Sequence, residues 1–77
     1  MNRSLIDLAP GEAGIVVLLE GGYGMQRRLR SLGIVEGNTV RVLSALAWGG
    51  PVVVEVNRAR VAIGRGMARH VKVAVSA

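Results

Sequence analysis

The sequence predicts an all-β fold, a small barrel of about five strands with one short α-helix inserted after the first strand. Three observations support this prediction. The 77 residues are 51% hydrophobic, and the apolar side chains are mainly valine, leucine and isoleucine, which suit a pleated sheet. Apolar residues alternate with polar ones along most of the chain. Glycine, proline or asparagine stands at the junctions between these runs and predicts turns there.

The first strand is predicted at residues 14–20, between two turn signals. Before it, Pro10-Gly11 is typical of a type II turn, because proline presets φ at the second position and glycine accepts the positive φ that follows. The run itself, Gly-Ile-Val-Val-Leu-Leu-Glu, is β-branched and apolar. The glycines at 21, 22 and 24 then end the strand.

A two-turn amphipathic helix is predicted at residues 25–32. Met25, Leu29 and Leu32 fall at i, i+4 and i+7, which places them on one face of a helix. Gly33 supplies the left-handed residue that ends the helix, and Ile34 can fold back on Leu29 as in a Schellman cap. Because two turns are too few to be stable alone, the apolar face must rest on the sheet.

After the helix, the period of the apolar residues returns to two, which predicts four further strands. Asn57-Arg58 can form a tight hairpin between two of them, because asparagine tolerates positive φ. A short irregular or single-turn segment is expected at 64–69. Five short strands can close on themselves and so remove open sheet edges. The four strands are expected at residues 39–46, 52–56, 59–63 and 71–75.

Length and composition limit the classes of protein that the chain can represent. We expect residues 1–77 to form a single domain, which must be held together by apolar packing, by contacts between copies, or by both. The absence of cysteine excludes disulfides and thiolate chemistry. No secretory signal is recognised, and the longest uncharged run is too short to span a bilayer. We therefore expect a cytoplasmic protein that does not insert into membranes.

The basic residues predict a surface that binds a partner. Ten Lys and Arg against five Asp and Glu give a formal net charge of +5. Such an excess favours an acidic protein face, nucleic acid or anionic lipid, and does not choose among them. A merely solvated face is the alternative for the arginines, and a lid over the barrel is the alternative for the tryptophan. The candidate partner-binding residues are Arg27, Arg28 and Arg30 on the helix, Arg58 and Arg60 at the hairpin, and Trp48 beside the Gly49-Gly50 turn.

Catalytic and metal-binding chemistry is weakly supported. His70 is the only histidine, and Asp7, Glu12, Glu20 and the N-terminal amine could join it in a metal site only if the fold gathered them. The glycine-rich segment at 21–24 fails both phosphate-binding patterns, because arginine occupies the positions where those patterns need other residues. No paired acids or nucleophile–base pair is evident. We therefore expect neither an enzyme nor a cofactor, and His70 stays a weak metal candidate.

Several segments in order resemble the ferrous iron transport protein A family (FeoA). The opening run from Leu5 to Glu12, followed by Gly-Ile-Val-Val, is similar to the start of that family. So is Arg28-Leu-Arg-Ser-Leu-Gly-Ile34 followed by Glu36-Gly37. Gly50-Pro51-Val52-Val53, Val61-Ala-Ile-Gly64 and Ala68 ahead of Val71 and Val73 complete the pattern, which covers essentially the whole chain.

The resemblance implies an SH3-like barrel and a role in ferrous iron uptake. It implies a cytoplasmic accessory or regulatory protein whose partner is a membrane ferrous iron permease carrying a GTP-binding domain. That partner would recruit the chain to the inner face of the membrane. Weak transition metal binding is also implied. The alternative is a small β-barrel that binds nucleic acid, which the charge favours and the scarcity of aromatic side chains disfavours. A homo-oligomer is left open.

Overall fold

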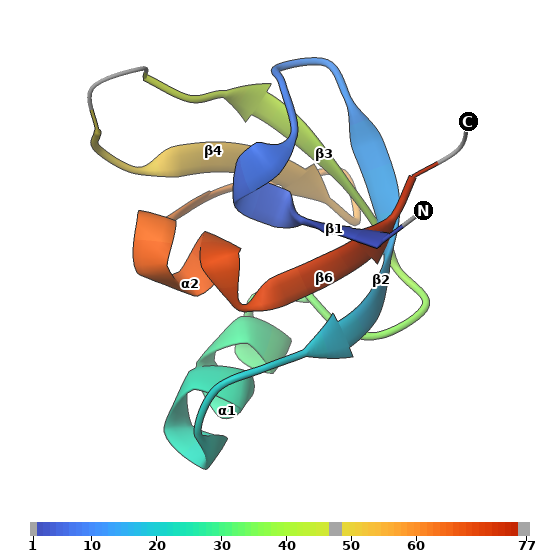
Figure 1. The fold of residues 1–77 in the computed structure, drawn as a ribbon, viewed down its shortest axis with the longest axis vertical. Helices are drawn as coiled ribbons and strands as arrows, with labels where there is room; N and C mark the ends of the chain where they lie inside the picture. Colours follow the sequence, from blue (N-terminus) through green and yellow to red (C-terminus); the bar gives the residue numbers. More distant parts are fainter. Residues whose placement is uncertain (1, 47–48, 76–77) are drawn as a thin grey trace.

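The computed structural model describes residues 2–46 and 49–75, which form one antiparallel sheet with three short helices (Figure 1). The strands follow one another in the sheet as β1-β6-β2-β3-β4-β5, and every ladder is antiparallel. Helix α1 comes between β2 and β3, and α2 between β5 and β6. The bounds are β1 Asn2–Ser4, 3₁₀ helix η1 Leu5–Asp7, β2 Ala13–Leu19, α1 Tyr23–Ser31, β3 Thr39–Ser44, β4 Val52–Val56, β5 Ala59–Ile63, α2 Arg65–Arg69 and β6 Val71–Ala74.

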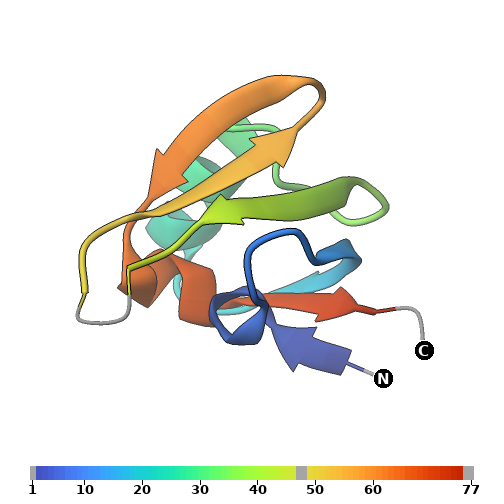
Figure 2. The same ribbon diagram turned by 90° about the horizontal axis from the view of Figure 1, so that it is seen from above.

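The predicted fold class is confirmed, and the structure adds two elements that the sequence did not indicate, strand β1 and the 3₁₀ helix η1. Strand β1 precedes the strand predicted as the first, and it pairs with β6, so the first and last strands of the described chain lie side by side (Figures 1 and 2). The segment expected to be irregular or a single turn forms α2. No helix in the described part of the chain is long and apolar enough to cross a membrane.

The core is apolar, and most of its members are aliphatic residues of the strands and of α1. In β4, Val52, Val54 and Val56 are buried while Glu55 between them is exposed. The predicted apolar face of α1 also points inward: Leu29 is fully buried, and Met25 and Leu32 pack against the core. The other buried residues are Leu5, Leu8, Val16, Leu19, Ile34, Val40, Val42, Ile63, Ala68, Val71 and Val73.

A bulge in β2 interrupts the simple alternation that the sequence predicts. The register against β6 shifts between Val16 and Leu18, so Val17 and Leu18 both face outward. Together with Ile15 they leave a row of exposed apolar side chains on this strand. A bulge also bends its strand, which helps a short sheet to curve around its core.

The end of α1 is a Schellman cap, as the sequence predicted. Ile34 N donates to Leu29 O at 3.1 Å, and Gly33 N donates to Arg30 O at 3.0 Å. Gly33 has φ +88°, a conformation that a side chain disfavours. Leu29 and Ile34 are both fully buried, so the apolar contact of the cap belongs to the core. The cap therefore fixes where the helix ends and where the chain turns toward β3.

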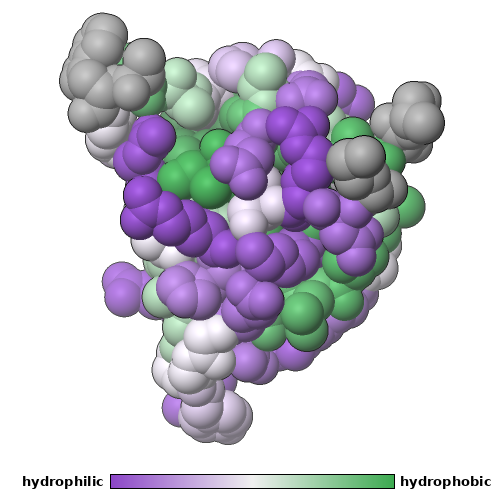
Figure 3. All heavy atoms as spheres, viewed as in Figure 1, coloured by the Kyte–Doolittle hydropathy of each residue, from purple (hydrophilic) through white to green (hydrophobic). Residues whose placement is uncertain are grey.

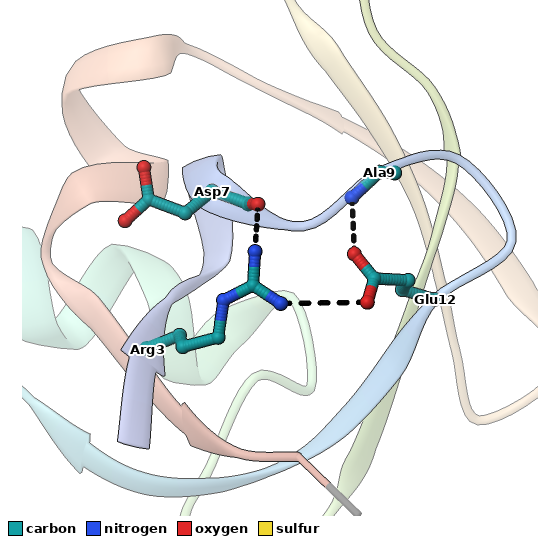
Figure 4. Close-up of polar contacts among 4 residues, drawn as sticks. All are labelled: Arg3, Asp7, Ala9 and Glu12. Carbon is teal, nitrogen blue, oxygen red and sulfur yellow. Dashed lines mark hydrogen bonds and ion pairs between the residues drawn. The ribbon is translucent and has the colours of Figure 1, made fainter. Parts of the chain in front are cut away.

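The opening segment is held by a small polar network (Figure 4). Arg3 donates to the backbone carbonyl of Asp7 and lies 3.4 Å from the carboxylate of Glu12. The other oxygen of Glu12 accepts from Ala9 N at 2.6 Å. Gly11 has φ +94°, and Glu12 N donates to Ala9 O, as a type II turn at Pro10-Gly11 requires. The network joins β1, η1 and the turn before β2.

The sheet does not close by hydrogen bonds, which differs from the expectation of a sheet without edges. Among the described residues, no ladder joins β1 to β5, so both are edge strands. The physical reason is that helices occupy the space between them: α2 follows β5 and contacts η1, which follows β1. Ala68 of α2 is fully buried and Met67 packs against the core. Strand β5 forms the margin of the sheet in Figure 2.

Candidate interaction surface

The predicted arginines lie on α1 and at the β4–β5 hairpin, and the hairpin turn lies close to the residues that follow α1. The turn of the β4–β5 hairpin packs against the end of α1, because a Cβ built on Gly33 would lie 3.0 Å from Nδ2 of Asn57. Asn57 has φ 52° and Arg58 has φ 66°, so both hairpin residues are left-handed, as a type I′ turn requires. The hairpin turn therefore lies beside the end of the helix. We call Arg27, Arg28, Arg58 and Arg60 the arginine surface.

The three arginines of α1 are all exposed, as predicted, but their surroundings differ. The Arg27 guanidinium stands 5.6 Å from the ring centroid of Tyr23, one turn earlier on the helix, which is a cation–π contact. Tyr23 is 77% exposed, so this pair presents an aromatic ring and a charge together. Tyr23 was not among the predicted site residues, because the helix was predicted to begin at Met25. In the structure α1 begins at Tyr23, which places Tyr23 and Arg27 at i, i+4 on the helix.

Arg30 forms an ion pair with Glu36 of the same chain. Its two terminal nitrogens donate to the two carboxylate oxygens of Glu36 at 2.9 and 3.1 Å, a bidentate pair. The hydrogen bond from Arg30 lowers the pKa of Glu36 below its ordinary value, and a backbone hydrogen bond adds to this shift. Since Glu36 lies in the turn that leads to β3, the pair braces the end of α1, and Arg30 is less available to another protein than its neighbours.

Arg28, Arg58 and Arg60 are the most available charges of the set. Their side chains are exposed and form no ion pair or hydrogen bond with any residue of 2–46 or 49–75. Arg60 lies opposite Glu55 across the hairpin, on the outer face of the sheet. An exposed guanidinium can bind a carboxylate or phosphate bidentately, so these side chains suit an acidic partner. Trp48, the remaining predicted contact residue, lies outside the described residues.

His70 is half-buried between α2 and the loop before α1. Its Nδ1 lies 2.7 Å from the carbonyl oxygen of Gly66, so this nitrogen carries the proton and donates. Its ring also lies against Gly21, where an added Cβ would be 3.1 Å from Cδ2. Among the described residues, no three His, Asp or Glu side chains converge as a metal site would need. The residues present therefore do not fit a tightly bound metal.

The structure also contains a shallow hollow where β2, β3 and β6 meet. It has a volume of about 220 Å³ and is lined by Ala13, Gly14, Ile15, Thr39 and Ala74. Its lining carries no acid, base or nucleophile other than one threonine hydroxyl, so it offers no chemistry. On the face shown in Figure 3, hydrophilic side chains cover most of the middle and apolar ones are confined to smaller areas.

These features define a class: a small SH3-like β-fold that carries exposed arginines on a helix and at a hairpin. Comparison with known proteins then gives the family. The sequence model of the FeoA domain matches residues 3–75, and the chain belongs to the FeoA family. A protein of Methanocaldococcus jannaschii named "Putative Fe(2+) transport protein A" is 36% identical over 63 residues, which are 82% of this chain and 74% of that protein.

Solved structures agree with this assignment. The crystal structure of an iron uptake regulatory protein (FeoA) matches with a TM-score of 0.90 and 38% identity, over 95% of this chain and 96% of that one. The solution structure of FeoA from Chlorobium tepidum matches with a TM-score of 0.86 and 28% identity, over 97% and 71%. A manganese-dependent transcriptional repressor contains a similar domain, with a TM-score of 0.89 and 26% identity, over 97% of this chain and 42% of the repressor.

Proposed function

We propose that this chain is an accessory protein of ferrous iron uptake that acts by binding, not by catalysis. Its partner is a membrane ferrous iron permease that carries a GTP-binding domain, and the chain acts in the cytoplasm, where that partner recruits it to the inner face of the membrane. The observation that carries the proposal is the match of the FeoA domain to residues 3–75. The relative from Methanocaldococcus jannaschii, named for Fe(2+) transport, supports the same process.

The arginine surface supports a role in docking to that partner. Arg27 and Arg28 project from a helix whose opposite face is buried, so they can meet another protein without disturbing the core. Exposed charges contribute modest affinity and mainly orient and accelerate encounter. An acidic region on the permease is therefore the expected contact, and binding should weaken as salt is raised.

The proposal is tested by retention of the permease from detergent-solubilised membranes on the tagged chain. The test variant is R27S/R28S, and the matched control is R41S/R69S, which removes the same charge from β3 and α2. If Arg27 and Arg28 each form one exposed ion pair with the permease, removing both pairs should lower the affinity by about two- to thirty-fold. We expect this loss for the test variant and near wild-type retention for the control. Circular dichroism of both variants serves as the control for folding, and we expect wild-type spectra.

Two outcomes would contradict the proposal. If the wild-type chain retains the permease neither in the presence of GTP nor in the presence of GDP, the permease is not its partner. Equal weakening by the test and control variants would show an effect of net charge and remove the helix from the interface. A salt titration against generic DNA tests the nucleic-acid alternative, which requires micromolar affinity near physiological salt and a steep salt dependence.

A further inference from the structure

Strand β5 presents an unpaired backbone edge. It pairs with β4 through the register Val56↔Ala59, Glu55↔Arg60, Val54↔Val61 and Val53↔Ala62. No other strand of the described sheet lies beside it. In a two-residue hairpin, the pair next to the turn, here Val56 and Ala59, exchanges backbone hydrogen bonds. Along the ladder, such hydrogen-bonded pairs alternate with pairs that form no hydrogen bonds to each other. The backbone groups of Arg60 and Ala62 therefore point away from β4.

These groups find no other backbone partner within the described residues. The hydrogen bonds outside the helices and ladders include none made by Arg60 or Ala62. Both residues are exposed, so their donors and acceptors face solvent along the open side of β5. Val61 between them is half-buried and packs against the core, which leaves an apolar contact on the inner side of the same edge. An unpaired edge with one apolar side can accept another strand.

The charges around this edge select the kind of strand. Arg60 lies on the outer face, and Arg58 stands beside it at the turn, without an ion pair to any described residue. Arg58 also has φ 66°, a conformation unfavourable for a residue with a side chain, and glycine would fit there with less strain. A second copy of β5 would bring like charges together on one face, which opposes pairing between copies. An acidic strand would bring opposite charges together.

We propose that the β5 edge binds an extended acidic segment of a partner protein, which adds to the sheet as a further antiparallel strand. The segment alternates acidic and apolar residues: the acids lie on the outer face near Arg58 and Arg60, and the apolar residues lie inward near Val61. Antiparallel pairing continues the pattern of every ladder in the sheet. The proposal goes beyond the proposed function, and it stands on the edge geometry and charge alone.

The test uses the intact chain and a synthetic peptide of alternating valine and glutamate, blocked at both ends and long enough to span the five residues of β5. Amide hydrogen exchange is followed by NMR. In the free protein, the amides of Arg60 and Ala62 should exchange rapidly, whereas that of Val61, bonded to Val54, should be protected and serves as an internal control. The peptide should slow exchange at Arg60 and Ala62. Replacing its glutamates by lysine should weaken binding about ten-fold or more.

Methylated peptides identify the backbone contact without changing the protein. In an antiparallel ladder, residues directly opposite each other share a face, so the glutamates bond to Arg60 and Ala62. N-methylation of the glutamates should abolish binding, and N-methylation of the valines should preserve it. The reverse result would place the same edge in a parallel ladder and overturn the antiparallel arrangement. Equal binding of both methylated peptides would overturn strand addition altogether.

Variants of the chain give an independent test. A62P removes the edge donor at a position where proline is tolerated, and A62T keeps the donor and serves as its control. We expect A62T to bind like the wild type and A62P to lose binding while both remain folded.

Protection of Arg60 and Ala62 that grows with protein concentration in the absence of peptide would show a second copy on the edge and overturn the acidic partner. A failed peptide test leaves retention of the permease unaffected, so the two proposals fail separately.

Discussion

The variant R58G should stabilise the protein while it removes a charge from the arginine surface. Arg58 has φ 66° at the second central position of the hairpin turn. A left-handed conformation costs a residue with a side chain about 1–2 kcal/mol, and glycine avoids this cost. Glycine loses more conformational entropy on folding, which returns about 0.5–1 kcal/mol. The net expectation is a gain of about 0.5–1 kcal/mol in the free energy of unfolding.

The matched control is R58A, which removes the same charge and keeps a Cβ in the left-handed conformation. Its free energy of unfolding should lie within about 0.5 kcal/mol of the wild type, as for most surface substitutions. For a domain of this size, the R58G gain corresponds to a rise of about 2–8 °C in Tm. Urea denaturation and calorimetry measure both variants. Equal stabilities of R58G and R58A would refute the argument that the turn is strained.

The same two variants separate stability from binding. Both lose the guanidinium, so both should bind the acidic peptide more weakly than the wild type, by about 1.4- to five-fold for one exposed ion pair. Only R58G should gain stability. A binding loss shared by both variants would therefore arise from the charge and not from a change in the hairpin. Binding equal to wild type in both would place Arg58 outside the contact.

Two further predictions concern α1 and its cap. L29A should lower the free energy of unfolding by about 2–5 kcal/mol, because Leu29 is fully buried. L32A should lower it less, since Leu32 is only partly buried. Thermal melting that finds L29A at least as stable as L32A would contradict this placement of the two side chains. The folded-state pKa of Glu36 lies below its ordinary value of 4.5, so the Arg30 pair stabilises the protein above that pH, and this contribution is lost as pH falls through the lowered pKa. Carbon-detected NMR titration should show the Glu36 pKa rising toward its ordinary value in R30Q, and an unchanged pKa would remove Arg30 as the cause.

Local signals in the sequence predicted the helix, its cap and the hairpin. Gly33 and Ile34 form the expected Schellman cap, and Asn57-Arg58 form the expected turn, because each depends on residues that lie close together in the chain. The alternation of Val52, Val54 and Val56 placed β4 with the correct face inward. These features need no knowledge of distant partners, so the sequence was sufficient for them.

Features that depend on distant contacts were missed. Strand β1 pairs Asn2 with Ala74, and its three residues carry no apolar alternation that would indicate a strand. The bulge in β2 depends on the register against β6, which the sequence of β2 alone does not specify. The ion pair between Arg30 and Glu36 likewise forms only because the turn after α1 brings Glu36 back beside the helix, and the sequence alone does not specify the course of that turn. As a result, the three helix arginines could not be distinguished from the sequence. In the structure Arg27 lies over Tyr23 and Arg30 pairs with Glu36, whereas Arg28 has no such contact with a described residue. The predicted contact residues themselves stay a prediction for the binding experiments.

The open edge and the arginines beside it can be understood together. An unpaired strand edge is a hazard, because a second copy can pair with it, and proteins commonly guard such edges with charge or by keeping them short. Strand β1 has three residues, which limits what can pair with it. Strand β5 has five, and its guard is positive charge at Arg58 and Arg60. A positive guard repels another copy of this chain but attracts an acidic strand. Under the proposed strand addition, the same side chains oppose self-association and admit an acidic strand, and the peptide experiments separate this role from that of a merely solvated surface.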